Sequence, residues 1–170
     1  MDGLIFSFPS DWQVAKYDET AFYRQQFQSF AGGSQAVDIV ALAGEVLWLI
    51  EVKDYRRRKR EKSIGLADEV ALKVRSTLAG LATARVRAND DSERQFARRA
   101  MLASQLRVAL HLEQSKKPSR LFPRAAEPKA IRLALKKALH PVDAHPILVS
   151  QTSPACPAPW SVVTFDADQS

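Results

Sequence analysis

Hydrophobic residues recur along this chain with two different periods, and each period predicts a different kind of element. Apolar residues spaced three or four apart predict helices, whereas alternation or a short apolar run predicts a strand. The helices predicted in this way are residues 19–30, 66–88, 92–104 and 128–139. The predicted strands are residues 11–17, 36–43, 46–53, 106–114 and 146–152. This order indicates a mixed α/β domain, with a central hairpin in its sheet and helices flanking it.

The chain is predicted to form a single domain over residues 1–153. Its 170 residues suit one domain with a hydrophobic core, and no linker is long enough to force a second one. Residues 154–170 begin with a Pro-rich stretch and are predicted to form an irregular tail. Within that tail, residues 160–165 have the pattern of an edge strand.

Composition narrows the class of protein. Apolar residues make up 46% of the chain and charged residues 26%, as in ordinary globular proteins. No apolar run approaches the roughly 20 residues of a membrane span, and the N-terminus lacks the pattern of a signal peptide. The single cysteine, Cys156, has no partner for an internal disulfide, which favours a reducing compartment. We therefore expect a cytoplasmic protein without a membrane partner.

The second and third predicted strands are joined by Gly44 and Glu45, which suit a two-residue hairpin loop. Glycine at the first loop position is typical of a type II′ turn. The register that this turn sets places Asp38 opposite Glu51, and opposed residues share a face of the sheet. Lys53 lies on the same face because side chains alternate along a strand. The turn therefore predicts that two acids and a lysine converge at one end of the hairpin.

This combination of side chains predicts a metal site for phosphate chemistry. Two close carboxylates repel each other unless one is protonated or a cation lies between them. Mg²⁺, or Mn²⁺ in its place, suits such oxygen ligands, and Mg²⁺ commonly binds substrate phosphates as well. Lys53 would stabilise charge on a phosphate or orient a water, so the set suits metal-assisted hydrolysis of a phosphodiester. The alternative is a surface Asp38 and a solvated Glu51–Lys53 ion pair.

A run of basic residues begins three residues after Lys53. Residues 56–62 carry a net charge of +5 out of +6 for the whole chain. Such a run is either a solvated loop or a contact for a polyanion. We expect it to bind the nucleic-acid backbone without reading sequence. Its basic residues are Arg56, Arg57, Arg58, Lys59, Arg60 and Lys62.

The stretch at residues 36–55 resembles the PD-(D/E)xK nucleases, the superfamily with the restriction-endonuclease-like fold. Its acid, short hairpin and Glu-Val-Lys end are locally similar to Holliday-junction resolvases of that superfamily. The resemblance implies that Asp38 and Glu51 bind the metal, together with the carbonyl of Val52. It also implies that Lys53 is the catalytic lysine.

Many members of that superfamily add an acid from the first helix. Glu19 is the candidate for this catalytic acid here, and Asp18 is the alternative. A first-turn glutamate is also favoured by the helix dipole alone, which leaves a structural role for Glu19 open.

The expected function is therefore that of a Mg²⁺- or Mn²⁺-dependent nuclease that hydrolyses DNA with low sequence specificity. From the superfamily we expect a role in phage defence or DNA repair. A homodimer or a larger complex is expected because cutting a duplex needs two sites. Two alternatives remain open: a non-cleaving nucleic-acid-binding or scaffold subunit with the same fold, and an RNA nuclease.

Overall fold

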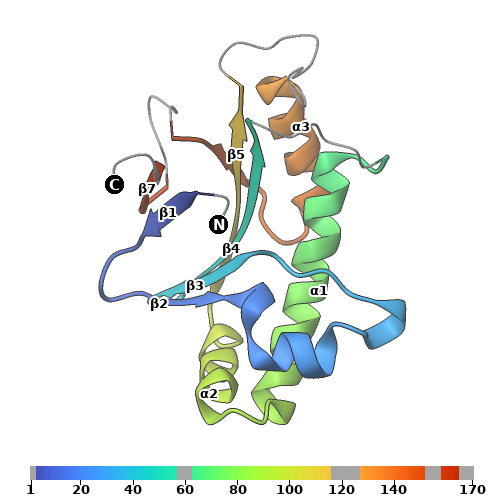
Figure 1. Ribbon diagram of the computed structural model, residues 1–170, viewed down its shortest axis with the longest axis vertical. Coiled ribbons are helices and arrows are strands. Elements are labelled where there is room, and N and C mark those ends of the chain that lie inside the picture. Colours follow the sequence, from blue (N-terminus) through green and yellow to red (C-terminus); the bar gives the residue numbers. More distant parts are fainter. Residues whose placement is uncertain (1–2, 57–62, 116–126, 152–157, 165–170) are drawn as a thin grey trace.

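A five-stranded mixed sheet forms the centre of the protein (Figure 1). The computed structural model describes residues 3–56, 63–115, 127–151 and 158–164. The strands lie in the order β2-β3-β4-β5-β6, antiparallel from β2 to β4 and parallel from β4 to β6. Their bounds are β2 Gln13–Lys16, β3 Ile39–Ala43, β4 Val46–Tyr55, β5 Gln105–Gln114 and β6 Ile147–Val149. The predicted mixed α/β fold with a hairpin in its sheet is confirmed.

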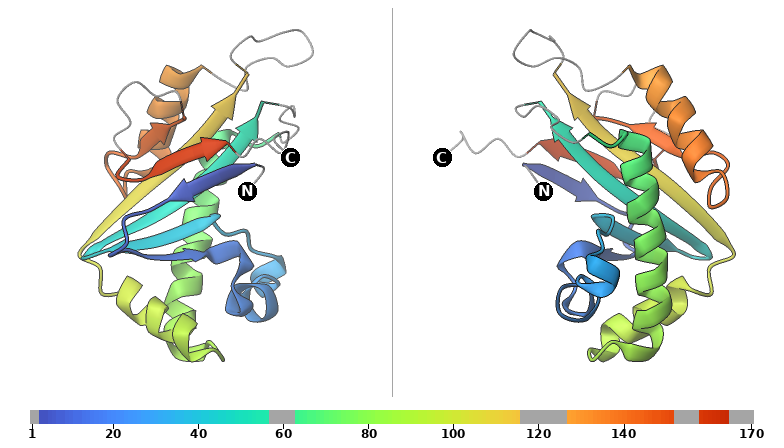
Figure 2. Two further views of the ribbon diagram at one scale, coloured as in Figure 1. Left: turned by 60° about the vertical axis from the view of Figure 1, so that its left-hand side comes forward. Right: turned by 90° about the vertical axis from the view of Figure 1, so that its right-hand side faces the viewer.

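Helices cover one face of this sheet, and a two-stranded ribbon covers the other (Figure 2). The helices are α1 Leu66–Arg87, α2 Asp91–Ala100 and α3 Pro128–Leu139. The ribbon pairs β1 Leu4–Ser7 with β7 Ser161–Thr164 in antiparallel fashion. No described helix has both the length and the apolar character needed to cross a membrane.

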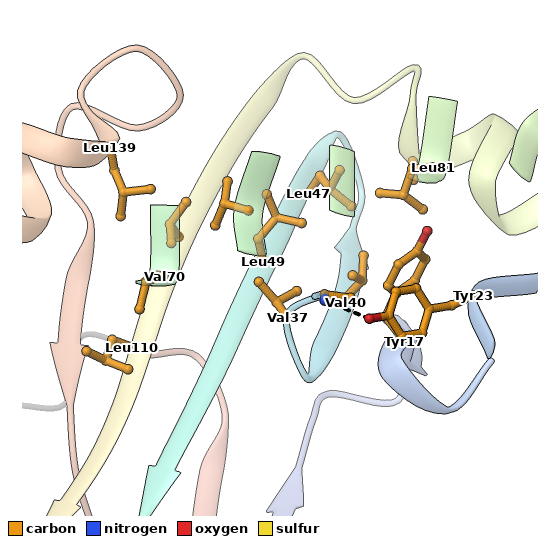
Figure 3. Packing of buried hydrophobic residues seen from close by; sticks show 14 of the residues in the cluster. Tyr17, Tyr23, Val37, Val40, Leu47, Leu49, Val70, Leu81, Leu110 and Leu139 are labelled. Carbon is orange, nitrogen blue, oxygen red and sulfur yellow. Dashed lines mark hydrogen bonds between the residues drawn. The ribbon is translucent and has the colours of Figure 1, made fainter. Parts of the chain in front are cut away.

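Two hydrophobic clusters hold these layers together. The larger one lies between the sheet and the helices, and Figure 3 shows Tyr17 and Leu81 toward one end of it and Leu110 and Leu139 toward the other. The smaller cluster lies under the β1–β7 ribbon and includes the buried Trp48. The strand expected near residues 160–165 is thus found as β7, whereas β1 was not predicted. The division of the chain at residue 153 stays a prediction.

The hairpin between β3 and β4 has the predicted register. Ala43 pairs with Val46, and the ladder continues to the pair of Ile39 and Ile50. Gly44 has a φ of +57°, while Glu45 keeps a negative φ. A positive φ at the first loop position alone is the pattern of the type II′ turn. The turn prediction is therefore confirmed.

The single helix predicted for residues 19–30 is wrong. The chain forms three short pieces instead: the 3₁₀ turns Tyr17–Glu19 (η1) and Phe30–Gly32 (η3), and between them the π-helical turn Tyr23–Phe27 (η2). The Tyr23 hydroxyl accepts a hydrogen bond from the Ala36 N–H (3.1 Å) and donates one to the Ser34 carbonyl (2.7 Å). These contacts tie the segment to the approach to β3, so tertiary contacts override the helical pattern.

The start of α2 lies one residue before the predicted one, at Asp91. Asp90 is the N-cap, and its carboxylate accepts a hydrogen bond from the Glu93 N–H at 2.9 Å. Aspartate is among the most favoured N-cap residues. The helix ends at Ala100, four residues before the predicted end.

Thr77 anchors α1 to the start of the hairpin. Its side chain is fully buried, and its hydroxyl accepts a hydrogen bond from the Val37 N–H at 3.0 Å. The same hydroxyl donates to the Lys73 carbonyl at 2.8 Å. This contact fixes the helix against Val37, the residue directly before Asp38.

Replacing Thr77 with valine tests this anchor. Thr77→Val keeps the shape but leaves the buried Val37 N–H without an acceptor, so the free energy of unfolding should fall by about 1–3 kcal/mol. Thr83→Val is the matched control, because Thr83 is exposed and its hydroxyl only donates to the Ala79 carbonyl of the preceding turn. Urea unfolding measures both variants, and an equal loss in the two would contradict the anchor.

Candidate functional site

A group of charged side chains lies between the end of β4 and the first half of α1. Glu51 is fully buried. Its Oε1 lies 2.8 Å from the Lys53 Nζ and 2.6 Å from the Lys73 Nζ. Lys53 also lies 2.9 Å from Glu69 Oε1 on α1. We call Glu51, Lys53, Glu69 and Lys73 the Glu51 cluster.

Alternation along β4 explains why Glu51 and Lys53 both face α1. They follow Leu47 and Leu49 on the face that packs against the helices, while Trp48 and Ile50 face the ribbon. On α1, Glu69 and Lys73 lie one turn apart beside the buried Val70. The strand and the helix therefore each supply one acid and one base.

Asp38 lies beside this cluster, as the hairpin register predicted. It precedes β3 by one residue, and its carbonyl accepts a hydrogen bond from the Tyr17 N–H at 2.9 Å. Its Oδ2 accepts a hydrogen bond from the Val52 N–H at 2.6 Å, which turns the carboxylate toward β4. The predicted convergence of Asp38, Glu51 and Lys53 is thus found, whereas their catalytic and metal-binding roles stay predictions.

Burial makes Glu51 an unusually weak acid. Its pKa is raised to about 7, first by burial and then by the nearby Asp38 carboxylate, while Lys73 and Lys53 act in the opposite direction. Burial is also the largest effect on Lys53 and lowers its pKa, but the contacts with Glu51 and Glu69 outweigh it and the net shift is upward. Both pKa values are raised, which favours the neutral form of Glu51 and the charged form of Lys53. We infer that Lys53 stays charged, while Glu51 titrates near neutral pH.

The charges of Asp38 and the Glu51 cluster would be balanced by one more positive charge. Within the described residues, the buried Oε2 of Glu51 makes no hydrogen bond. Asp38 and the cluster together contain one more acid than base. No group of three or more His, Cys, Asp or Glu side chains in the described part of the chain is arranged to hold a metal. Any cation here would therefore rely on two carboxylates and on backbone oxygen.

Asp18, rather than Glu19, lies in the electric field of this site. The pKa of Asp18 is raised, first by burial and then by the Asp38 carboxylate. Glu19 is half-exposed, and its carboxylate lies 4.0 Å from the Lys16 ammonium. Both acids lie in a 3₁₀ turn and not in the first turn of a long helix. The catalytic role predicted for Glu19 gains no support from these contacts.

The basic run is only partly described. The Arg56 guanidinium binds both carboxylate oxygens of Asp54, at 2.6 and 2.9 Å, and donates to the Thr164 hydroxyl at 3.2 Å. Arg56 is therefore engaged within the protein. The other basic residues predicted to bind nucleic acid lie outside the described residues: Arg57, Arg58, Lys59, Arg60 and Lys62.

Sequence reasoning did not place the two residues from α1 in the cluster: Glu69 was not considered, and Lys73 was assigned to a solvated helix face. Glu69 and Lys73 show the four-residue spacing of a helical ion pair, which was the available signal. That spacing is common on solvated helix faces, however. It does not indicate that a buried residue of a strand, here Glu51, faces the helix. The side chain of Lys73 is only 12% exposed because Glu51 faces it.

One comparison finds a known protein that is similar to this chain. The cysteine--tRNA ligase of Neisseria meningitidis serogroup A / serotype 4A (strain DSM 15465 / Z2491) is 32% identical over 154 residues. The match covers 73% of this chain but 22% of the ligase, so the chain spans about a fifth of that protein. No protein-family model matches the chain. No solved structure matches it either.

This match contradicts the nuclease interpretation. The similar protein is named as a ligase for tRNA and not as a phosphodiester hydrolase, so the predicted PD-(D/E)xK membership and the Mg²⁺-dependent DNA nuclease activity are wrong. The RNA-nuclease alternative is wrong for the same reason. The physical cause of the error is local: a buried glutamate at the end of a strand needs a nearby cation, and a lysine two residues later supplies one whatever the protein does.

The titration of Glu51 predicts a pH dependence of stability. Between its ordinary pKa of 4.5 and the raised value of about 7, the folded protein holds a proton that the unfolded chain has released. Rising pH therefore favours unfolding in this window, by roughly 3 kcal/mol at most. The contribution is fully present below pH 4.5 and lost above about pH 7.

Glu51→Gln isolates this effect. The unfolding free energy of the unchanged protein minus that of the variant should fall between pH 4.5 and about 7 and then level off. Urea unfolding in metal-free buffer over this range measures the difference. A difference that rises through the window would mean that the lysines, and not burial, dominate the titration of Glu51.

Proposed function

We propose that this chain is a tRNA-binding domain that holds RNA by its phosphate backbone and does not cleave it. The observation that carries the proposal is the match to a segment of a cysteine--tRNA ligase. Because the chain spans about a fifth of that ligase, we assign it a binding role and not the ligase reaction. A cytoplasmic location is part of the same proposal, and it is supported by the single cysteine of the chain.

The surface of α3 suits a polyanion. The helix buries Ile131, Leu135 and Leu139 against the core. It contains no acidic residue, so no carboxylate within the helix offsets its positive charge. Lysine and arginine side chains that neutralise phosphates supply most of the sequence-independent affinity for nucleic acids. The exposed basic residues of α3 are Lys129, Arg132, Lys136 and Lys137.

The Glu51 cluster lies on the same side of the sheet as this helix. Figure 1 shows α3 beside the first half of α1, the half that carries Glu69 and Lys73. The acids of the cluster are buried and paired with lysines, so they oppose a phosphate less than exposed acids would. RNA on α3 would therefore meet the exposed bases of this helix and not the buried acids of the cluster.

A divalent cation, Mg²⁺ or Mn²⁺, is a second part of the proposal. The buried, unpartnered Glu51 Oε2 and the adjacent Asp38 carboxylate fit a hard cation, and the Val52 carbonyl would be a further ligand. Lys53 and Lys73 already share the other oxygen of Glu51, which favours weak binding. The ion would supply positive charge for a nearby phosphate. Asp38 and Glu51 would hold it and keep their own charges neutralised.

Reversing charge on α3 tests the RNA contact. Lys136→Glu/Lys137→Glu should weaken binding of a tRNA transcript by about tenfold or more. It should also flatten the dependence of log Kd on log salt by about 1 to 2, since each lost phosphate contact removes roughly 0.7–0.9 of slope. Fluorescence anisotropy at several salt concentrations measures both quantities, and electrophoresis afterwards should recover the RNA at full length.

The control is Arg85→Glu/Arg87→Glu, which makes the same change in net charge on exposed residues at the far end of α1. It should change affinity much less. Equal losses in the two variants would attribute binding to net charge and remove α3 from the interface. Duplex DNA added as a competitor tests whether the protein also binds DNA, as expected from the sequence. Shortening of the RNA during the assay would contradict the non-cleaving role.

Adding Mg²⁺ or Mn²⁺ tests the cation. Binding to the folded state raises stability, by about 2.7 kcal/mol at one hundred times the Kd, so the Tm should rise with metal concentration. Asp38→Asn/Glu51→Gln should abolish the rise. Asp11→Asn, which neutralises an exposed acid near β2, should keep it. A Tm that responds equally in all three proteins would show binding elsewhere.

A further inference from the structure

Strand β2 lies at one end of the five-stranded sheet and pairs with β3 alone. The opposite end of the sheet is β6, in which no residue is exposed. In β2, by contrast, the apolar side chain of Val14 is 42% exposed. An unpaired strand edge with an exposed apolar side chain is a template for pairing with another chain. Of the two edges of this sheet, that of β2 is therefore the one open to a further strand.

The pairing of β2 with β3 determines which backbone groups of β2 point outward. Tyr17, directly after β2, donates its N–H to the carbonyl of Asp38, which lies opposite it when the register of the two strands is continued. In an antiparallel pair, residues bonded to the partner strand alternate with residues whose N–H and C=O point away from it. Val14 and Lys16 belong to the second kind, and these backbone groups have no hydrogen-bond partner among the described residues. Two donors and two acceptors thus line the free edge.

A cavity of about 380 Å³ lies beside this edge. Gln13, Val14 and Ala15 all line it, so it follows the strand itself and not only one face of the sheet. Ala15 pairs with Val40 of the larger hydrophobic cluster and therefore faces the helices. Because opposed residues share a face, residues of an added strand opposite Gln13 and Ala15 would enter the cavity. Its apolar wall includes Phe22, Leu81, Ala84 and Phe96.

The wall of the cavity contains two charged residues, Glu93 and Arg99. Glu93 is already engaged, because its two carboxylate oxygens accept hydrogen bonds from the N–H groups of Ala21 and Phe22, each at 2.8 Å. Arg99 is exposed and has no ion-pair partner among the described residues. Together with Gln13 it also lines a second pocket, which places it toward the start of β2. The unmatched charge is positive and favours an acidic group on the incoming strand.

The cavity favours a foreign strand over β2 of a second copy. Hydrogen-bonding groups that alternate along an edge are matched by an extended chain, and pockets beside the edge then select its side chains. In a symmetric antiparallel pair of β2 strands, the outward groups of Val14 and Lys16 would bond to their own counterparts. Each copy would then present Gln13 and Ala15 to the cavity of the other. One polar and one small side chain would leave the apolar wall uncovered.

We propose that the edge of β2 binds an extended peptide of a partner protein by strand addition. The peptide has a large apolar side chain that fills the cavity, and an acidic side chain two residues away that contacts Arg99. Two residues at this spacing share one face of a strand. The site is separate from the basic face of α3 and from the Glu51 cluster, so it does not depend on the proposed binding of tRNA.

The peptide Thr-Asp-Val-Phe-Val-Asp-Thr is a suitable probe, because an acid flanks its phenylalanine at the required spacing in either direction. A fluorescein-labelled form should bind the full chain in an anisotropy titration. Replacing its phenylalanine with alanine should weaken binding by about tenfold or more, since an aromatic side chain would leave the cavity. No binding of the probe, or equal binding of the two peptides, overturns the proposal.

Arg99→Gln tests the charged contact. The unchanged protein should prefer the probe to a peptide with both aspartates replaced by lysine, and Arg99→Gln should remove most of this preference. Arg98→Gln is the matched control, because Arg98 is exposed on the same helix but does not line the cavity. Arg98→Gln should retain the preference. An equal effect of the two substitutions removes Arg99 from the site.

Methylation of the peptide backbone distinguishes strand addition from side-chain docking. The N–H groups that point toward β2 alternate along an added strand. Methylating the N–H of both valines, or that of the phenylalanine and the second aspartate, should abolish binding, while the other pattern should be tolerated. The valine pattern is the sensitive one for an antiparallel strand. Equal tolerance or equal loss in the two patterns contradicts strand addition.

Amide hydrogen exchange followed by NMR examines the edge in the protein itself. In the free protein the N–H groups of Val14 and Lys16 should exchange much faster than that of Ala15, which faces β3. Saturating probe should slow exchange at Val14 and Lys16 by at least tenfold, and unchanged exchange would refute the proposal. Sedimentation tests the other occupant: a dimer of the free protein that the probe dissociates would assign this edge to a second copy and overturn the partner peptide.

Discussion

The burial of the Glu51 carboxylate is the constraint on which the arrangement of β4 and α1 depends. A fully buried acid in a sheet is costly unless cations lie against it. Lys53 supplies one from the same strand, and Lys73 supplies the other from α1. Losing either lysine would leave the buried carboxylate with one cation in place of two, which costs more than a lost surface ion pair. The helix is therefore held to the sheet by charge as well as by its apolar face.

The same constraint explains why a short motif misled functional inference. Glutamate and lysine two residues apart share one face of a strand, so a lysine at that spacing is the nearest cation that a strand can offer its own buried acid. Glu69 then satisfies Lys53 from the helix side. The motif places a lysine beside a buried glutamate. That arrangement suits both a metal-dependent hydrolase and a structural ion pair. The tRNA ligase match, and not the motif, separates the two.

Local signals predicted the elements that local physics determines. Gly44 fixed the hairpin register, and Pro128 at the start of α3 marked that helix correctly. The pairing of β1 with β7 was harder to predict from sequence, because the two strands lie near opposite ends of the chain. The contact of Lys73 with Glu51 was not predicted for a similar reason: Glu51 lies 22 residues away in sequence and on another element.

Electrostatic separation links the cluster to the proposed binding role. The two acids of the Glu51 cluster, Glu51 and Glu69, are buried beneath the helix layer, and two lysines lie against them. The bases of α3 are exposed and lie in a helix without acids. Charges that are buried and paired act weakly at a distance, whereas exposed unpaired bases set the surface potential. Acids that hold α1 in place thus do not offset the exposed bases of α3, as the proposed contact with a phosphate backbone requires.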